Sequence, residues 1–278
     1  MDDETNLKDW IGRTTEAEDV LRPEPARFMQ ATLDRTPDLA VGSELPHLWH
    51  WLYFLEAKRP SELGRDAHPR RGRFLPPVPL PRRMWAGGRF GFHMPLILGQ
   101  KTNRTSTIKD VVEKDGRTGQ LCFVTVQHNI YQGGRLALTE EHDIVYRGDP
   151  DPGAPKAQLM QAPDHADASQ VVHPTEVLLF RYSALTFNGH RIHYDAAYAR
   201  DVEGYEGLVF HGPLTATLLI DMAIGKFELR PKRFEFRGLA PLSGMHAFKI
   251  EACLTSDKVD LWAKRHDDAL AMTATANF

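Results

Sequence analysis

The sequence predicts an α+β fold in which two similar units lie side by side, each an antiparallel sheet wrapped around a helix. Three observations support this fold class. Residues 212–229 (GPLTATLLIDMAIGKFEL) are apolar almost all round, and a helix without a polar face must be enclosed by other elements. Strand-like segments recur in a similar order in the two halves of the chain. A segment rich in Pro, Asp and Ala separates the two sets.

Residues 1–147 are expected to form the N-terminal unit. Their apolar periodicity predicts a helix over 23–36, and an aromatic-rich stretch predicts another over 47–57. Residues 59–83 hold six prolines and seven arginines, which disfavours both a helix and a central strand. We expect them to be a solvated loop or a contact for the phosphates of a ligand. The strand candidates that follow are 88–100, 101–116, 121–131 and 135–147.

Residues 148–174 are expected to be a linker, and residues 175–278 a C-terminal unit that carries the catalytic motif. Its buried helix is followed by strand-like segments at 233–242, 245–254, 258–265 and 269–278. Only the C-terminal half carries a polar motif of the kind found at residues 187–195. We therefore expect one active site per molecule, between the two units.

Composition excludes several classes of partner. With 278 residues, 42% hydrophobic and 26% charged, the chain is typical of a soluble globular protein. The net charge of −3, without basic and aromatic residues alternating along a face, argues against nucleic acid. The most apolar window, 207–225, contains His211, Pro213 and Asp221 and is too polar to span a membrane.

The cysteines and the N-terminus predict a cytoplasmic protein. Cys122 and Cys253 lie in apolar, strand-like contexts and are expected to be buried free thiols, which is typical of a reducing compartment. The first ten residues, MDDETNLKDW, are acidic and polar, unlike a secretory signal or an Arg-rich transit peptide.

One stretch carries more chemistry than a helix or strand requires: FNGHRIHYD, residues 187–195, has two His, an Asn, an Arg and an Asp. About twenty residues later, Gly212 and Pro213 open the buried helix, whose first amides lack intrahelical partners. Those amides and the positive end of the helix dipole suit a developing oxyanion. The combination predicts proton transfer beside a carbonyl that acquires negative charge, as when a thioester forms an enolate.

The segment FRYSALTFNGHRIHYD, followed by GYEGLVFHGPL, resembles the MaoC-type, R-specific enoyl-thioester hydratases and dehydratases of the double hot-dog fold. It is most similar to the branch with mesaconyl-C4-CoA hydratase, itaconyl-CoA hydratase and mitochondrial 3-hydroxyacyl-thioester dehydratases. The likeness is dense over 177–225 and looser in the first half, where RRMWAGGR (82–89) resembles a recurring element. The resemblance implies a double hot-dog hydro-lyase that hydrates an α,β-unsaturated acyl-CoA reversibly and uses no cofactor.

Aligned on the family pattern, His193 takes the position of the catalytic histidine and Gly212 that of the oxyanion-hole glycine. Asn188 stands where most of the family has an aspartate, His190 replaces the family asparagine and Arg191 its proline. An amide cannot accept a proton at neutral pH. We therefore expect His193 to act alone as base and then acid, with Asn188 holding the water.

Arg191 is expected to set specificity, because a cation beside the base favours a substrate with a second, free carboxylate. This predicts a C5 dicarboxylate mono-thioester, itaconyl-CoA or mesaconyl-C4-CoA, hydrated to citramalyl-CoA. Alternatively, Arg191 pairs with Asp195 as scaffold; Asp195 could also assist His193. In RRMWAGGR, we expect either a plain turn into a strand or a backbone approach to the ligand. The further residues expected to contact substrate are His190, Asp195, His211, Trp85, Gly87 and Gly88.

The sequence motifs typical of metal binding, nucleophilic hydrolysis and phosphate binding are absent. A metal site built from His190, His193 and Asp195 has no supporting Cys or carboxylate cluster, so no metal is expected. The chain has no G-x-S-x-G and no phosphate-binding glycine motif. Two alternatives remain: a 3-hydroxyacyl-thioester dehydratase of fatty-acid metabolism, using CoA or a carrier protein, and a non-catalytic acyl-thioester-binding module. Association into a homodimer is left open.

Overall fold

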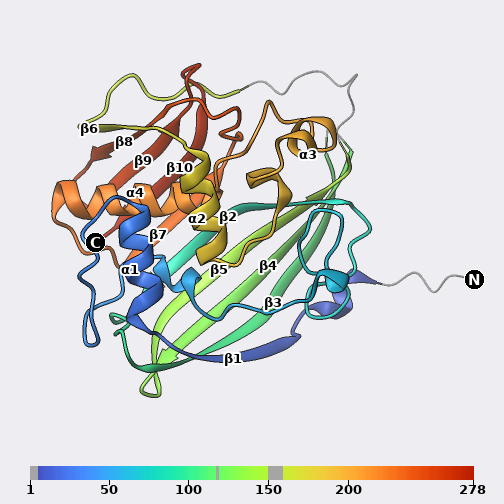
Figure 1. The fold of residues 1–278 in the computed structure, drawn as a ribbon, viewed down its shortest axis with the longest axis horizontal. Coiled ribbons are helices and arrows are strands. Elements are labelled where there is room, and N and C mark those ends of the chain that lie inside the picture. Colours follow the sequence, from blue (N-terminus) through green and yellow to red (C-terminus); the bar gives the residue numbers. More distant parts are fainter. Residues whose placement is uncertain (1–5, 117–118, 150–158) are drawn as a thin grey trace, which may run out of the picture.

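A single antiparallel sheet of ten strands runs through the molecule in the computed structural model, which describes residues 6–116, 119–149 and 159–278 (Figure 1). The strand order is β1-β3-β4-β5-β2-β7-β10-β9-β8-β6. The first five strands come from the N-terminal half and the last five from the C-terminal half. The two halves are therefore joined where β2 pairs with β7, and the predicted α+β class is confirmed.

The strands of the N-terminal half are long and alternate in burial, as expected of a sheet with one covered face. They are β1 (Thr14–Val20), β2 (Arg82–Phe92), β3 (Lys101–Gly116), β4 (Gly119–Gln132) and β5 (Arg135–Arg147). The strands of the C-terminal half are shorter. They are β6 (Ala168–Val172), β7 (Arg233–Gly238), β8 (Phe248–Leu254), β9 (Lys258–Lys264) and β10 (Leu270–Asn277).

Among the described residues, three of the four α-helices lie in the C-terminal half. The α-helices are α1 (Pro23–Thr32), α2 (Glu176–Leu185), α3 (Ala196–Asp201) and α4 (Gly212–Phe227), and the 3₁₀ helices are η1 (Leu7–Trp10), η2 (Trp49–Leu52), η3 (Pro60–Glu62) and η4 (Arg191–His193). The apolar helix expected over 212–229 is confirmed as α4. It packs against β7, β8, β9 and β10, which enclose its apolar surface.

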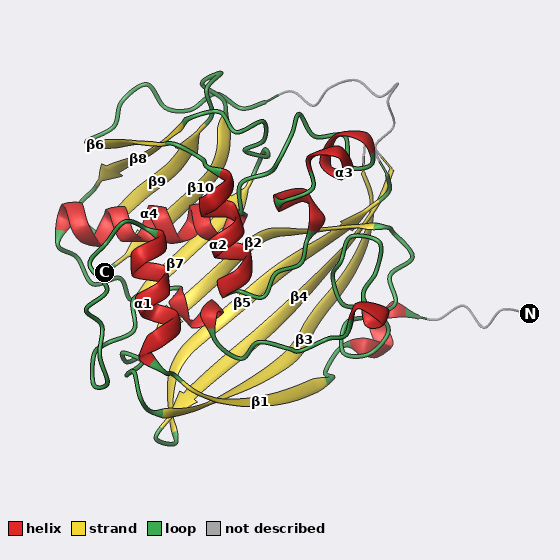
Figure 2. Cartoon of the chain, in the orientation of Figure 1, coloured by secondary structure: helices red, strands yellow, loops and turns green. Residues whose placement is uncertain are grey.

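The first half departs from the prediction in its helices. The helix expected over 23–36 is α1, which ends at Thr32 and packs against α2 (Figure 2). The helix expected over 47–57 is wrong, because only the short η2 forms there. Leu48 is left-handed at φ 65°, and the side chains of His50 and Trp51 both bind Glu140. The aromatic residues serve this tertiary contact rather than a helix face.

The stretch expected to be a linker, 148–174, contains a strand. Its residues 150–158 lie outside the described part of the structure. Further along, β6 pairs with β8 at the edge of the sheet. This corrects the expectation of an irregular connection, since a polar edge strand carries little hydrophobic signal. The division into units 1–147 and 175–278 stays a prediction.

Gly87 and Gly88 serve the joint between the halves. Gly88 pairs with Phe236 of β7, and a Cβ on Gly87 would lie 2.6 Å from the carbonyl oxygen of Phe236. The strand bulges between Trp85 and Gly87. This corrects the expectation that the two glycines approach a ligand: the missing side chains let β2 and β7 come together.

Candidate active site

A cavity of about 690 Å³ lies between the two halves of the chain. The N-terminal half contributes residues of β2 to β5 and the loop before β2, and the C-terminal half contributes the FNGHRIHYD loop and the start of α4. The residues of the predicted site that line this cavity are Trp85, Asn188, His190, His193 and Gly212.

His193 closes η4 and is 7% exposed. Its Nδ1 lies 2.8 Å from the carbonyl oxygen of Val209. A carbonyl only accepts, so Nδ1 carries the proton and Nε2 keeps a free lone pair. Burial lowers the pKa of His193 to about 4. The structure thus presents a neutral imidazole with a basic nitrogen in the cavity.

Asn188 and Gly212 complete the predicted arrangement around His193. The Asn188 Oδ1 accepts a hydrogen bond from the His190 amide at 3.0 Å, which leaves Nδ2 to donate to a water. Gly212 is the first residue of α4, where the amide has no partner within the helix. A Cβ at Gly212 would meet only Met272, at 4.0 Å. The amide can therefore be approached by a thioester oxygen.

His211 lies behind the site rather than on its wall. It is fully buried, stacks on His193 and binds the Ser183 hydroxyl through Nε2 at 2.8 Å. It is not among the residues that line the cavity. This corrects its expected contact with substrate: its contact is with the base.

Arg191 and Asp195 bind each other, at 2.7 Å between Nη2 and Oδ2. The guanidinium also lies over the Tyr198 ring, and Asp195 caps α3 by accepting from the Tyr198 amide. Neither residue lines the cavity. This corrects their assignment to substrate binding, and the scaffold alternative describes their contacts. The metal triad considered for His190, His193 and Asp195 is not assembled either.

Trp85 lines the cavity on the side of the N-terminal half. Its ring stacks on His142 with 3.8 Å between centroids, and its indole N–H donates to the Gly87 carbonyl. These two contacts fix the ring as a wall of the cavity.

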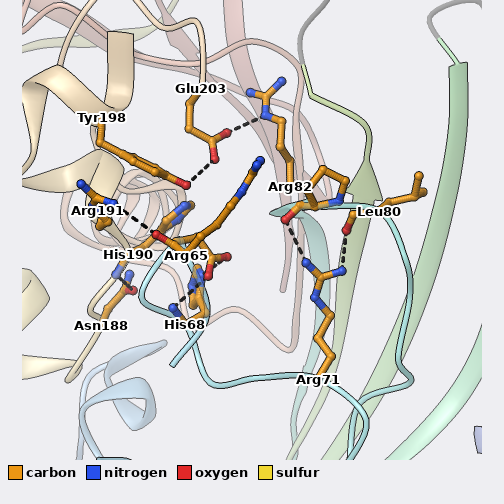
Figure 3. A network of polar contacts seen from close by, with 12 residues as sticks. Arg65, His68, Arg71, Leu80, Arg82, Asn188, His190, Arg191, Tyr198 and Glu203 are labelled. Atoms are coloured by element: carbon orange, nitrogen blue, oxygen red, sulfur yellow. Dashed lines mark hydrogen bonds and ion pairs between the residues drawn. The ribbon is translucent and has the colours of Figure 1, made fainter. Parts of the chain in front are cut away.

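His68 reaches the site from the loop before β2, with Asp66 beside it, and neither residue was predicted from the sequence. Asp66 Oδ2 accepts from His68 Nδ1 at 3.0 Å. The His68 ring lies 4.3 Å from the His190 ring, between centroids (Figure 3). An Asp-x-His in an irregular, Pro-rich stretch has no periodicity that predicts its direction, so only the fold could reveal this pair.

Arg83, the last residue of the Arg-rich segment expected to be a solvated loop or a phosphate contact, also lines the cavity, from the start of β2. Neighbouring arginines are engaged. Arg82 binds Glu203 at 2.5 Å, and Arg71 donates to the Leu80 carbonyl (Figure 3). Arg71 also donates to the carbonyls of residues 78 and 81, and Arg191 binds Asp195. Arg83 forms no ion pair with any residue in the described part of the chain. It is therefore available to an anionic ligand.

Asp66, His68 and His190 also have ligand-type atoms within 4.8 Å of one another. Both Asp66 oxygens already accept from His68, one from Nδ1 and the other from the backbone amide. The grouping is thus a hydrogen-bonded pair beside a third ring.

Across the described residues, no helix has the length and apolarity needed to cross a bilayer.

Comparison with known proteins places this site in context. A family model described as hydroxyacyl-thioester dehydratase type 2 matches residues 48–244. The chain is 46% identical over 270 residues to the mesaconyl-C(4)-CoA hydratase of Chloroflexus aurantiacus, across 96% of this chain and 95% of the relative.

Two solved structures share the fold. A MaoC-like dehydratase from Phytophthora capsici matches with a TM-score of 0.71 at 13% identity, over 98% of this chain and 97% of that chain. A Mycobacterium tuberculosis protein with a double hot-dog fold matches with a TM-score of 0.55 at 14% identity, over 96% of each chain. The predicted double hot-dog is confirmed.

Proposed function

Because the chain belongs to the hydroxyacyl-thioester dehydratase type 2 family and is a hydro-lyase, we propose that it adds water reversibly to mesaconyl-C4-CoA, giving citramalyl-CoA. The relative at 46% identity carries that substrate in its name. The observation that carries the proposal is the fixed, neutral His193 in one cavity with the free amide of Gly212.

His193 removes a proton from a water molecule that Asn188 Nδ2 holds. The water oxygen attacks Cβ, and the electrons of the double bond move to the thioester oxygen, which the Gly212 amide stabilises. The proton then returns to Cα and the carbonyl reforms. General base catalysis and one oxyanion donor are each worth about 10²- to 10⁴-fold in rate.

We assign the free carboxylate of the substrate to Arg83. In mesaconyl-C4-CoA this carboxylate is bonded to Cβ, the carbon that water attacks, so its partner must lie near His193. The charge of Arg83 is close enough to both His68 and His190 to lower their pKa, after burial as the main cause. A charge-assisted pair with a carboxylate contributes about 1.5–3 kcal/mol.

A substrate panel tests this function. The protein is incubated with mesaconyl-C4-CoA, itaconyl-CoA and crotonyl-CoA, and loss of the enoyl-thioester absorbance is followed. We expect the highest kcat/KM with mesaconyl-C4-CoA. Faster turnover of crotonyl-CoA would favour the fatty 3-hydroxyacyl-thioester dehydratase, which the family description also supports. Binding without turnover of any would indicate a non-catalytic module.

An acyl-CoA is the partner that this function requires. We propose a cytoplasmic location because neither cysteine forms a disulfide and Cys122 is buried. Fractionation of cells that express the chain checks the location, and light scattering checks the open expectation of a homodimer.

A further inference from the structure

The loop that carries Asp66 and His68 is docked firmly on the catalytic loop of the other half. The Arg191 amide donates to the Asp66 carbonyl at 3.2 Å. A Cβ at Gly189 would lie 3.0 Å from the Ala67 carbonyl oxygen. Ala67 itself is left-handed at φ 63°, which costs a residue with a Cβ about 1–2 kcal/mol. Contacts from both halves thus hold Asp66 and His68 in place against local strain.

Three imidazoles form a row along the cavity wall. The rings of His193 and His190 lie 5.5 Å apart and those of His190 and His68 lie 4.3 Å apart, between centroids. All three residues line the cavity. Asp66, which is 7% exposed, ends the row through its 3.0 Å contact with His68. The row therefore leads from the base to a buried carboxylate.

The two ends of the row differ in the groups that they contact. His193 is bound to a neutral carbonyl and stacked on His211. His68 faces Asp66, with the cations Arg83 and Arg71 also close. Within the described chain, Asp66 is the one carboxylate hydrogen-bonded to a ring of the row. As in other Asp–His pairs, the carboxylate fixes the tautomer and stabilises the imidazolium.

We propose that Asp66 and His68, supplied by the N-terminal half, form a proton relay with His193 and take the place of the carboxylate that Asn188 lacks. The inference rests on the proposed hydration. As the water oxygen bonds to Cβ, its O–H bond breaks and the proton passes from Nε2 of His193 through His190 to His68. The proton returns along the same row to form the Cα–H bond from the enolate. No other reactant is needed.

Asp66→Asn and His68→Gln test the relay with the full-length protein and mesaconyl-C4-CoA. We expect each to lower kcat about 10²- to 10³-fold and to change KM little, because the pair acts on the proton and not on binding. The double variant should be no slower than His68→Gln, since the two residues act as one unit. Arg65→Gln is the matched control on the same loop, because its side chain binds Asp149 instead.

Chemical rescue separates a relay from a structural role. Added imidazole should restore His68→Ala at least about tenfold with saturation, since it can carry the proton. Kcat within about threefold of the parent in Asp66→Asn, additive losses in the double variant, or no rescue would each overturn the relay. Activity abolished by a chelator and restored by Zn²⁺ would also overturn it. A parent that turns over none of the thioesters refutes the proposed function, whereas an active parent with fully active variants refutes the relay alone.

Discussion

His193 and His211 lie face to face, with 3.6 Å between ring centroids and 19° between ring planes. Protonation of either ring would place a positive charge directly against the other ring. Burial holds the pKa of His211 well below its ordinary value, and His193 lowers it further. His211 thus remains neutral beside the base, and the stack keeps the His193 ring in one orientation.

Replacement of His193 by Gln should nearly abolish hydration while the fold persists. The ring is the only group in the proposed mechanism that takes the proton from water, so we expect kcat to fall about 10²- to 10⁴-fold. The assay is absorbance of the enoyl thioester, with the melting temperature measured beside it. His165→Gln is the control, because His165 is 80% exposed and its one ion pair among the described residues is with Asp167. Activity within tenfold of the parent in His193→Gln contradicts the assignment of the base.

The pH profile should show a base that titrates at low pH. Burial lowers the pKa of His193 to about 4, and only the neutral ring accepts a proton. We expect kcat/KM to be flat near neutrality and to fall only as the pH approaches 4. A descending limb near pH 6.5, the ordinary value for a free histidine, would place another group in the role.

Stability should fall with pH in a defined window. Burial lowers the pKa of His68 and His193 to about 4, and that of His142 to about 3. Because these folded values lie below the unfolded value of about 6.5, the unfolded chain binds more protons between them. The melting temperature should therefore be highest above pH 6.5 and fall toward pH 4. His142→Phe should make that slope shallower; an unchanged slope would show that His142 does not contribute.

Substitution of Arg83 and substitution of Arg191 should differ in their effect on substrate selectivity. Arg83→Gln should lower kcat/KM for mesaconyl-C4-CoA about 10- to 100-fold and affect crotonyl-CoA little, because only the first has a free carboxylate. Arg191→Gln should lower kcat/KM for both substrates to a similar extent, since Arg191 binds Asp195. If Arg191→Gln lowered kcat/KM for mesaconyl-C4-CoA alone, and Arg83→Gln lowered it equally for both substrates, the carboxylate contact would be assigned to Arg191.

The ion pair of Arg82 and Glu203 should be important for stability. The side chains are 5% and 4% exposed, and Glu203 also accepts from the Tyr198 hydroxyl at 3.1 Å. Glu203→Gln removes the charge opposite a buried guanidinium, which typically costs about 3–5 kcal/mol of unfolding free energy. Urea unfolding measures this. Glu18→Gln, in an exposed pair with Lys101, is the control and should leave the midpoint unchanged.

The elements with a strong hydrophobic pattern could be predicted from the sequence. The helix α4 has no polar face, and β3, β4 and β5 alternate clearly, so each appears within a few residues of its expected range. β1 was missed, because an edge strand with exposed and half-buried positions has little apolar periodicity.

The candidate site could be predicted only where one segment supplies it. His193, Asn188 and Gly212 follow from the motif and the helix start. Asp66 comes from an irregular stretch of the other half, and Arg83 from the start of β2. Nothing local shows that the fold brings Arg83 to the cavity and places Asp66 behind the cavity residue His68. For Arg191 the sequence left two alternatives, because charge next to the base in sequence does not determine the direction of a side chain; in the structure it binds Asp195.

The pairing of β2 with β7 also bears on how the protein reaches its active form. These two strands are separated in the chain by β3, β4, β5 and β6, and the cavity exists only once they have met. Closing so long a stretch of chain is slow, because its entropy is lost before the contacts form. During refolding, the circular dichroism signal of the secondary structure should return early, and enzymatic activity should return last.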